Sequence, residues 1–129
     1  MKRACVIGWP IEHSRSPLIH GHWLRRYRIE GEYTKVAVRP EEAADFLRTL
    51  GARGFAGCNV TAPHKEAACR AAQVVEEDAR AVGAANTLWL DDGVLRATNT
   101  DTYGYMAHLA RSAPAWKGAG SVAGVIGAG

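Results

Sequence analysis

Short apolar segments alternate along this chain with segments of helical periodicity. Residues 4–8 form an apolar run of strand length, and Ile19, Trp23 and Tyr27 then recur at helical spacing. Strands that alternate with helices predict an α/β domain. The alternation continues with predicted strands at residues 32–38, 54–58, 84–90 and 94–98, and with predicted helices at residues 40–50, 64–81 and 102–111.

Two local features refine this fold class. One predicted helix has an apolar stripe that should face a core, formed by Ala43, Phe46, Leu47 and Leu50. Asp91-Asp92-Gly93, between the last two predicted strands, is typical of a β-hairpin turn. A hairpin requires an antiparallel strand pair, so we expect a mixed sheet rather than a purely parallel one.

Composition predicts an ordinary globular chain. With 129 residues, 47% of them hydrophobic, it can bury a sizeable core. The formal net charge of +3 comes from basic residues scattered along the sequence, so we expect no nucleic-acid partner. We also expect no membrane segment, because no apolar run has the necessary length. Three cysteines without paired spacing, Cys5, Cys58 and Cys69, fit a reducing cytoplasm better than secretion.

A polar cluster at residues 59–65 holds the main candidate for chemistry. It follows an apolar strand, so Asn59 and Thr61 should lie near that strand's carboxyl end. Pro63 suits the first turn of a helix that carries Lys65. Thr61 could equally cap this helix while Lys65 stays in solvent, and for an isolated lysine that alternative is favoured. The catalytic interpretation therefore depends on companions elsewhere in the chain.

One companion cluster lies at residues 13–17, directly after the first predicted strand. Ser16 is placed as a helix N-cap with Pro17 at the first helical position. Ser14 has no such structural role. Two hydroxyls beside helical N–H groups can receive a carboxylate or phosphate, so Ser14 and Ser16 are candidate anion-binding residues.

The other companion cluster comes from the hairpin. Asn86 lies at the head of its first strand, and Asn99-Thr100-Asp101 follows its second strand. Judged alone, Asp101 is a helix cap and Asn86 closes a turn. Because all three clusters fall at strand ends or strand-to-helix junctions, where α/β sheets assemble ligand sites, they predict one shared site.

The end of the chain has a different pattern. Residues 113–120 interrupt the periodicity, and a new apolar strand is predicted from Ser121 to Ile126, followed by Gly127-Ala128-Gly129. A strand followed by Gly-x-Gly begins a dinucleotide-binding βαβ unit, where glycines allow a tight turn beside a pyrophosphate. The rest of that signature is missing from these residues. A lone strand cannot bury itself, so this segment should find little to pack against.

Taken together, these clusters resemble the successive signatures of the shikimate dehydrogenase family, at residues 8–17, 59–65, 83–88 and 99–101. The resemblance implies a substrate-binding catalytic domain at residues 1–112, in which helices cover both faces of a mainly parallel, mixed sheet in three layers. Residues 113–129 would then be a linker and the first strand, with its glycine turn, of an NADP-binding Rossmann domain.

The resemblance also implies an activity and a set of site residues. The activity is that of an oxidoreductase, the reversible NADPH-dependent reduction of 3-dehydroshikimate to shikimate in aromatic amino-acid and chorismate biosynthesis. The implied residues are the catalytic pair Lys65 and Asp101, the substrate-binding residues Ser14, Ser16, Asn59, Thr61 and Asn86, and the cofactor-binding residues Gly127, Ala128 and Gly129.

The chemistry agrees with this pair on independent grounds. Hydride addition to a ketone develops negative charge on oxygen, which needs a proton or a fixed cation at that moment. Lys65 can provide either, and Asp101 can accept hydrogen bonds from both the lysine and the reacting hydroxyl. The sequence leaves open whether Lys65 transfers the proton or only stabilises the charge.

Some positions depart from the family's commonest pattern, namely Gly21, Ala62 and Thr102, and none of them removes an assigned functional group. Quinate-using relatives share most of these signatures, while two serines in the first cluster favour shikimate. We expect a truncated enzyme that binds substrate weakly and does not turn over alone. The alternative is a stand-alone module that binds shikimate without chemistry.

The remaining polar residues predict no further site. The five histidines have no carboxylate or cysteine partners at metal-binding spacing, so we expect no metal. The expected partner is a small molecule, and the expected assembly is a monomer or a homodimer.

Overall fold

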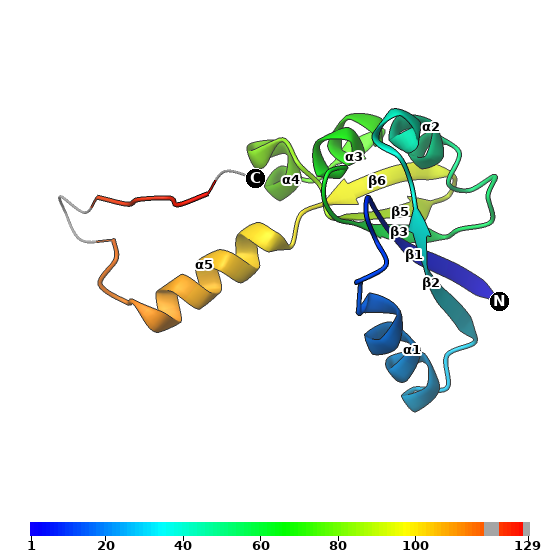
Figure 1. Cartoon of the computed structure of the whole chain (residues 1–129), viewed down its shortest axis with the longest axis horizontal. Helices are drawn as coiled ribbons and strands as arrows, with labels where there is room; N and C mark the ends of the chain where they lie inside the picture. The colour runs from blue at the N-terminus through cyan, green and yellow to red at the C-terminus, as the bar shows by residue number, and fades with distance from the viewer. Residues whose placement is uncertain (118–121, 128–129) are drawn as a thin grey trace.

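Six strands and five α-helices follow one another in the computed structural model, which describes residues 1–117 and 122–127 (Figure 1). A single 3-10 turn precedes the second helix. In chain order the elements are β1 (Lys2–Gly8), α1 (Ser16–Arg26), β2 (Gly31–Ala37), η1 (Pro40–Glu42), α2 (Ala43–Arg48), β3 (Gly57–Val60), α3 (Lys65–Ala71), β4 (Val74–Val75), α4 (Glu77–Val82), β5 (Thr87–Asp91), β6 (Val94–Thr98) and α5 (Asp101–Ser112).

The strands form one six-stranded sheet in the order β2-β1-β3-β5-β6-β4. β1 pairs in parallel with β2 and β3, and β4 pairs in parallel with β6. Only β5 runs the other way, antiparallel to β3 and to β6. The sheet is therefore mixed and mainly parallel, and the predicted α/β fold class is confirmed.

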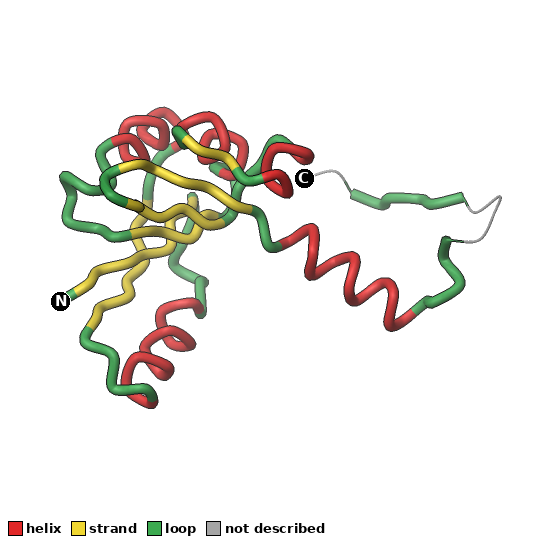
Figure 2. The backbone as a smooth tube through the Cα atoms, turned by 180° about the vertical axis from the view of Figure 1, so that it is seen from behind, coloured by secondary structure: helices red, strands yellow, loops and turns green. Residues whose placement is uncertain are grey.

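Helices lie on both faces of this sheet. α2, α3 and α4 cover one face, and α1 lies against the other face beside β1 and β2 (Figures 1 and 2). α5 leaves the end of β6 and extends away from the sheet (Figure 2). Three layers result, with α5 standing apart from them.

The main core lies between the sheet and the α2–α3 face. Ile7, Leu47, Leu50 and Leu88 are at most 1% exposed and pack there. Full burial of one such side chain contributes about 1.5–3 kcal/mol, so this layer supplies most of the stability of the domain. The predicted apolar stripe is confirmed, because all four of its members are buried, namely Ala43, Phe46, Leu47 and Leu50.

The opposite face is covered more thinly. Every residue of α1 is exposed or half-buried, and Leu18 and Trp23 retain 73% and 47% of their exposure. An aromatic stack joins α1 to the sheet. The His20 ring lies parallel to the ring of Tyr33 in β2, with a centroid separation of 4.0 Å and an interplanar angle of 7°. This stack fixes the tyrosine ring on that face.

The predicted hairpin is confirmed. β5 and β6 pair from Thr87 opposite Thr98 to Asp91 opposite Val94. Asp92 and Gly93 connect them with φ values of 48° and 82°. Two successive positive φ values are the signature of the tight turn that matches the twist of paired strands.

The prediction of one helix over residues 64–81 is wrong. The chain leaves α3 at Ala72 and forms β4 before α4 begins. The cause is a tertiary contact, because the Gln73 N–H donates to the Leu95 carbonyl and the Gln73 side chain accepts from the Leu95 N–H, both at 2.9 Å. These bonds to β6 outweigh the helical preference of an alanine-rich segment.

The strand predicted at residues 54–58 is displaced along the chain. Gly54 has a φ of 82° and belongs to a turn, and the strand itself begins at Gly57 and ends at Val60. Asn59 therefore lies inside β3 rather than after it. The reason is that the glycine supplies a left-handed turn, which ends the α2 connection before the strand can start.

Residues 122–126 form no strand in the described part of the chain, so that prediction is wrong there, and Ser121 lies outside the described residues. Val122, Val125 and Ile126 are 87% or more exposed. A strand without a neighbour has no ladder to join, which explains the difference.

Gly57 offers a test of how tightly β3 and β5 approach each other. A Cβ atom at Gly57 would lie 2.7 Å from the Leu88 carbonyl oxygen, which is backbone and cannot rotate away. We expect Gly57→Ala to lower the free energy of unfolding by about 1–3 kcal/mol in chemical denaturation. Gly104→Ala is the matched control, since a Cβ there meets nothing within 4 Å; it should stabilise α5 by about 0.5–1 kcal/mol. Equal effects of the two substitutions would contradict the close approach.

Candidate functional site

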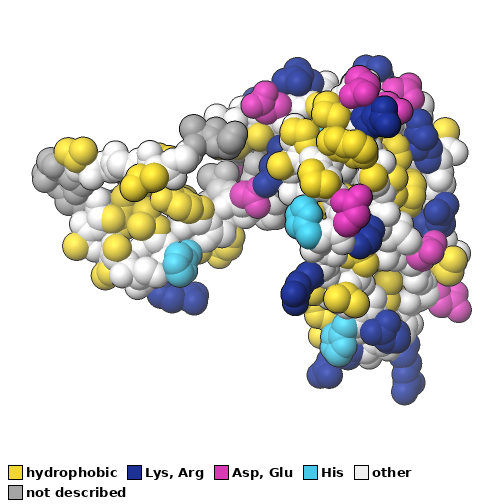
Figure 3. Space-filling model, viewed as in Figure 1, with side chains coloured by type: hydrophobic (Ala, Val, Ile, Leu, Met, Phe, Trp, Pro, Cys, Tyr) yellow, Lys and Arg dark blue, Asp and Glu magenta, His cyan; other side chains and the backbone are white. Residues whose placement is uncertain are grey.

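The polar clusters meet at one edge of the sheet. β1, β3 and β6 are parallel and end there, and β5 is antiparallel, so it begins there. Lys65 is the first residue of α3, Asp101 is the first residue of α5, and Asn86 directly precedes β5. In the space-filling view an open notch separates α5 from α1 on this side of the molecule (Figure 3).

Lys65 and Asp101 form the central contact of the site. The Lys65 Nζ donates to the Asp101 Oδ2 at 2.6 Å, and the two side chains remain 36% and 54% exposed. An ion pair with this exposure contributes only about 0–1 kcal/mol to stability, because water and salt screen it. The pair is therefore accessible to a ligand. A ligand that rearranged it would lower the stability of the fold only slightly.

Asn86 fixes the other oxygen of the carboxylate. Its Nδ2 donates to the Asp101 Oδ1 at 3.0 Å and to the Thr100 Oγ1 at 2.8 Å. Its Oδ1 accepts the Thr100 N–H at 3.1 Å and the Thr87 hydroxyl at 3.0 Å. Because both ends of the amide are engaged, Asn86 has one orientation and Asp101 is held from both sides.

Thr100 occupies the N-cap position of α5 without a side-chain cap bond, and the side chain of the preceding Asn99 takes over the capping of the helix that carries Asp101. The Asn99 Oδ1 accepts the N–H groups of Asp101 at 2.8 Å and of Thr102 at 3.3 Å, and its Nδ2 donates to the Ala84 carbonyl at 2.8 Å. Its exposure is 4%. Asp101, judged alone, was expected to be the cap; Asn99 performs that role and leaves the Asp101 carboxylate free for Lys65.

Asn59 joins the site through Thr87. The Asn59 Nδ2 donates to the Thr87 Oγ1 at 3.1 Å, and its Oδ1 accepts the Tyr33 hydroxyl at 2.7 Å. Tyr33 was not predicted as part of the site. Its only sequence signal was a place in a strand of partly alternating polarity, and the parallel pairing of β1 with β2 and β3 is what carries it to Asn59.

Thr61 and His64 hold the connection between β3 and α3. The Thr61 N–H donates to the Ile7 carbonyl at 3.0 Å, and Thr61 lines a shallow pocket of about 310 Å³ together with Lys65. His64, 1% exposed, has its Nε2 2.7 Å from the Val38 carbonyl oxygen. Sequence reasoning gave His64 no role; its hydrogen bond anchors the backbone next to Lys65.

The two predicted anion-binding serines lie at the start of α1. The prediction that Ser16 caps α1 is wrong, because Arg15 occupies the N-cap position without a side-chain cap bond and Ser16 is the first helical residue. Instead the Ser14 Oγ accepts the Ser16 N–H at 3.4 Å. Ser14 lines a separate pocket of about 760 Å³ with Tyr33.

These serines approach the rest of the site through Tyr33. Burial raises the pKa of Tyr33, and a hydrogen bond from the Ser16 side chain partly offsets that rise. Within residues 1–117, no hydrogen bond joins Ser14 or Ser16 directly to Lys65 or Asp101.

The predicted cofactor residues are only partly visible. Gly127 has a φ of 93°, which suits a glycine turn, whereas Ala128 and Gly129 lie outside the described residues. The exposed residues 122–127 neither pair in a sheet nor line one of the described pockets. Of the three predicted cofactor residues, the structure thus describes only Gly127, whose backbone conformation suits the predicted glycine turn.

Metal-binding clusters and membrane-spanning helices are both absent from residues 1–117 and 122–127. These residues contain no group of three or more His, Cys, Asp or Glu side chains that could hold a metal ion. They also contain no helix with the length and hydropathy that spanning a membrane requires.

Residues 6–88 match the family model described as the shikimate dehydrogenase substrate binding domain. The chain belongs to the shikimate dehydrogenase family. It is 56% identical over 115 residues to a shikimate dehydrogenase (NADP(+)) of Brucella abortus (strain S19), and this match covers 89% of this chain and 40% of the relative. It is 52% identical over 128 residues to a shikimate dehydrogenase (NADP(+)) of Mesorhizobium japonicum, and this match covers 99% of this chain and 45% of the relative. The chain thus spans less than half the length of these curated relatives.

A solved structure agrees with this family assignment. The crystal structure of shikimate 5-dehydrogenase from Thermus thermophilus in complex with NADP(H) and shikimate has a TM-score of 0.78 and 35% identity to this chain. The similarity covers 87% of this chain and 42% of that protein. The shikimate dehydrogenase fold therefore extends over most of the residues described above.

Asn99 provides a test of how the site is held. We expect Asn99→Ala to lower the free energy of unfolding by about 1–3 kcal/mol, because it removes the α5 cap and leaves the Ala84 carbonyl unpaired in a half-buried position. Chemical denaturation measures this loss. Asn99→Asp separates the two contributions, since it keeps the cap acceptor and loses the donor. A full loss with Asp and none with Ala would contradict the capping role.

Proposed function

We propose that this chain supplies the substrate-binding and acid-base part of an NADP-dependent shikimate dehydrogenase, which interconverts 3-dehydroshikimate and shikimate. The observation that carries the proposal is the contact between Lys65 and Asp101, with Asn86 holding the second carboxylate oxygen. This arrangement lies at the sheet edge where α/β proteins bind ligands, in a chain of the matching family.

The proposed chemistry assigns one role to each catalytic side chain. The nicotinamide cofactor supplies the hydride that adds to the carbonyl carbon when it is bound. The Lys65 side chain is 36% exposed, so its ammonium group can give a proton to the carbonyl oxygen or stabilise its charge. Asp101 orients the ammonium group and can accept a hydrogen bond from the hydroxyl that forms.

The proposed substrate contacts come from the surrounding polar residues. The hydroxyl of Ser14 keeps its hydrogen for a ligand, since the Ser14 Oγ accepts from a backbone N–H, and it is proposed with Ser16 to bind the substrate carboxylate. Asn59, Thr61 and Asn86 are proposed to surround the ring and its hydroxyls. Shikimate is proposed over quinate because both serines are present.

The proposed division of the protein follows the end of α5. Residues 1–112, which include every helix and strand among the described residues, are proposed as the substrate domain, and residues 113–129 as the linker and first segment of a nucleotide-binding domain. We therefore expect residues 1–129 alone to bind shikimate weakly and to show no turnover with NADP⁺. The free cysteines Cys5, Cys58 and Cys69 favour a reducing compartment such as the cytoplasm.

Lys65→Ala tests the catalytic assignment. Residues 1–129 would replace the matching 45% of the Mesorhizobium japonicum relative. We expect kcat to fall about 10²- to 10⁴-fold with a small change in KM, because the lysine interacts most strongly with the developing charge. Steady-state kinetics in both directions measure this split.

Lys2→Ala is the matched control, since Lys2 lies at the opposite end of β1 from the site. It should leave both constants unchanged. An effect of Lys65→Ala on KM alone would make Lys65 a binding residue and not a catalytic one.

The carboxylate assignment is tested in the 129-residue chain itself. We expect the double variant Ser14→Ala with Ser16→Ala to weaken shikimate binding about 10- to 100-fold in calorimetry, because hydrogen bonds to charged groups are worth about 1.5–3 kcal/mol. Its unfolding free energy is measured in parallel by chemical denaturation, because the variant also removes the Ser14 Oγ that accepts the Ser16 N–H. Ser112→Ala, at the far end of α5, is the control. Unchanged affinity in the double variant would refute the assignment.

A further inference from the structure

A chain of side-chain hydrogen bonds leads from β2 across the sheet to Asp101, and its direction is fixed at the Asp101 end. A carboxylate only accepts, so the Asn86 group that faces Asp101 is the amide nitrogen. The Asn86 oxygen then faces the Thr100 N–H, which can only donate. The two neighbours leave Asn86 a single orientation.

The same reasoning sets every bond further along. The Asn86 Oδ1 can only accept, so Thr87 donates its hydroxyl hydrogen to it. The Thr87 oxygen is then the acceptor for the Asn59 Nδ2. The Asn59 Oδ1 therefore faces Tyr33, and Tyr33 must donate to it at 2.7 Å.

Tyr33 is well fixed as that donor. Burial raises the pKa of its phenol, so the hydroxyl keeps its hydrogen throughout the neutral range. Its ring is held by the parallel stack on His20, and burial lowers the pKa of this histidine, which favours the neutral ring. Each donor in the series thus points toward Asp101, from Tyr33 through Asn59, Thr87 and Asn86.

We propose that Tyr33 is a positioning residue of the site, whose hydroxyl sets the orientation of the Asn59 amide and, through Thr87, supports the Asn86 amide that holds Asp101. Without the phenol hydrogen, the Asn59 Oδ1 loses its partner, and the amide is held only through its Nδ2, which donates to the Thr87 Oγ1 at 3.1 Å and to the Asn86 carbonyl at 3.5 Å. A turned amide presents its oxygen to Thr87 and draws the hydroxyl hydrogen away from Asn86. The role of these residues toward shikimate rests on the function proposed above, whereas the hydrogen-bond direction does not.

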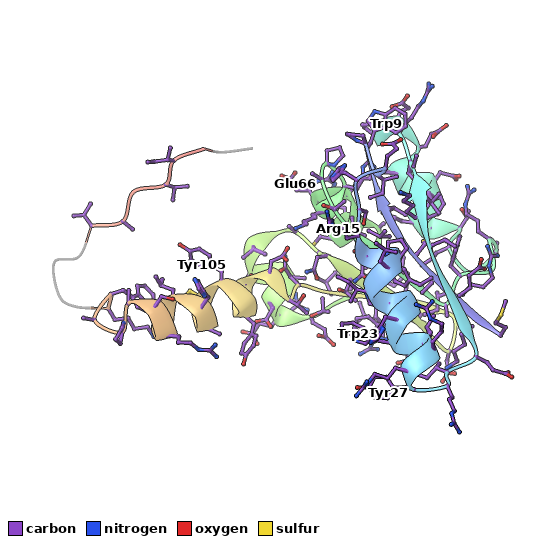
Figure 4. The ribbon with its side chains drawn as sticks, turned by 60° about the horizontal axis from the view of Figure 1, so that its bottom comes forward. Trp9, Arg15, Trp23, Tyr27, Glu66 and Tyr105 are labelled. Carbon is purple, nitrogen blue, oxygen red and sulfur yellow. The ribbon has the colours of Figure 1, made fainter. Side chains whose placement is uncertain are left out.

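Tyr33→Phe in the 129-residue chain tests this relay, since it removes one oxygen and keeps the stacked ring. The control is Tyr27→Phe, because Tyr27 is 65% exposed at the end of α1 (Figure 4). Side-chain amide signals of Asn59, Asn86 and Asn99 would be followed by ¹H–¹⁵N NMR. We expect the first two to shift and exchange hydrogen faster in Tyr33→Phe. Asn99 should not move, since its amide is bonded to Ala84 instead.

Three NMR outcomes overturn the proposal. A change at Asn59 alone ends the relay there, a change at all three amides indicates general loosening, and no change removes the role of Tyr33. Thr87→Val provides a second route, because it deletes the middle hydroxyl and leaves the Tyr33–Asn59 bond in place. It should move Asn86 more than Tyr33→Phe does, and an unmoved Asn86 in this variant would also overturn the relay.

Calorimetry with shikimate adds the functional readout. We expect Tyr33→Phe to weaken binding about tenfold, and Tyr27→Phe to leave it unchanged. Equal affinity of Tyr33→Phe and the unaltered chain would refute the positioning role. If the unaltered chain does not bind shikimate at all, the proposed substrate is wrong, and the NMR result still decides the relay.

Discussion

The antiparallel direction of β5 is the constraint on which the site depends. In a purely parallel sheet the amino end of this strand, with Asn86, would lie at the edge opposite the carboxyl ends of β3 and β6. Because β5 is reversed, Asn86 lies beside Asp101 and Thr87 lies opposite Asn59. The hairpin turn at Asp92 and Gly93 makes this reversal possible in two residues, far from the site itself.

Stability and chemistry come from different parts of the molecule. The buried apolar layer under α2 and α3 holds the sheet together, whereas the Lys65–Asp101 pair is exposed enough to contribute little. The polar residues are therefore free to be arranged for a ligand. Two of them, His64 and Asn99, are buried and bonded to the backbone, and they transmit the rigidity of the core to the pair.

Local patterns predicted the elements and the polar clusters that contain Lys65 and Asp101, because periodicity and strand ends are properties of neighbouring residues; the pairing of these two residues came from the family resemblance. The features that the sequence did not predict are fixed by contacts between residues far apart in the chain. The break after α3 depends on Leu95, and both the Tyr33–Asn59 and the His64–Val38 bonds join residues 26 positions apart. Nothing near these residues in the chain marks such contacts. The Ser16 cap prediction was wrong for a different, local reason, since a serine before proline fits both a cap and a first helical residue.

The order in which these contacts constrain one another explains why the Lys65–Asp101 pair can be accessible and still well placed. Asn99 fixes the first turn of α5, and a carboxylate at the start of that helix is favoured by its dipole. Asn86 then selects one rotation of the Asp101 carboxylate, and Lys65 meets the oxygen that remains. Lys65 itself makes only this one side-chain bond among the described residues, so its ammonium group is the part of the site that can turn toward a ligand while its partners stay fixed.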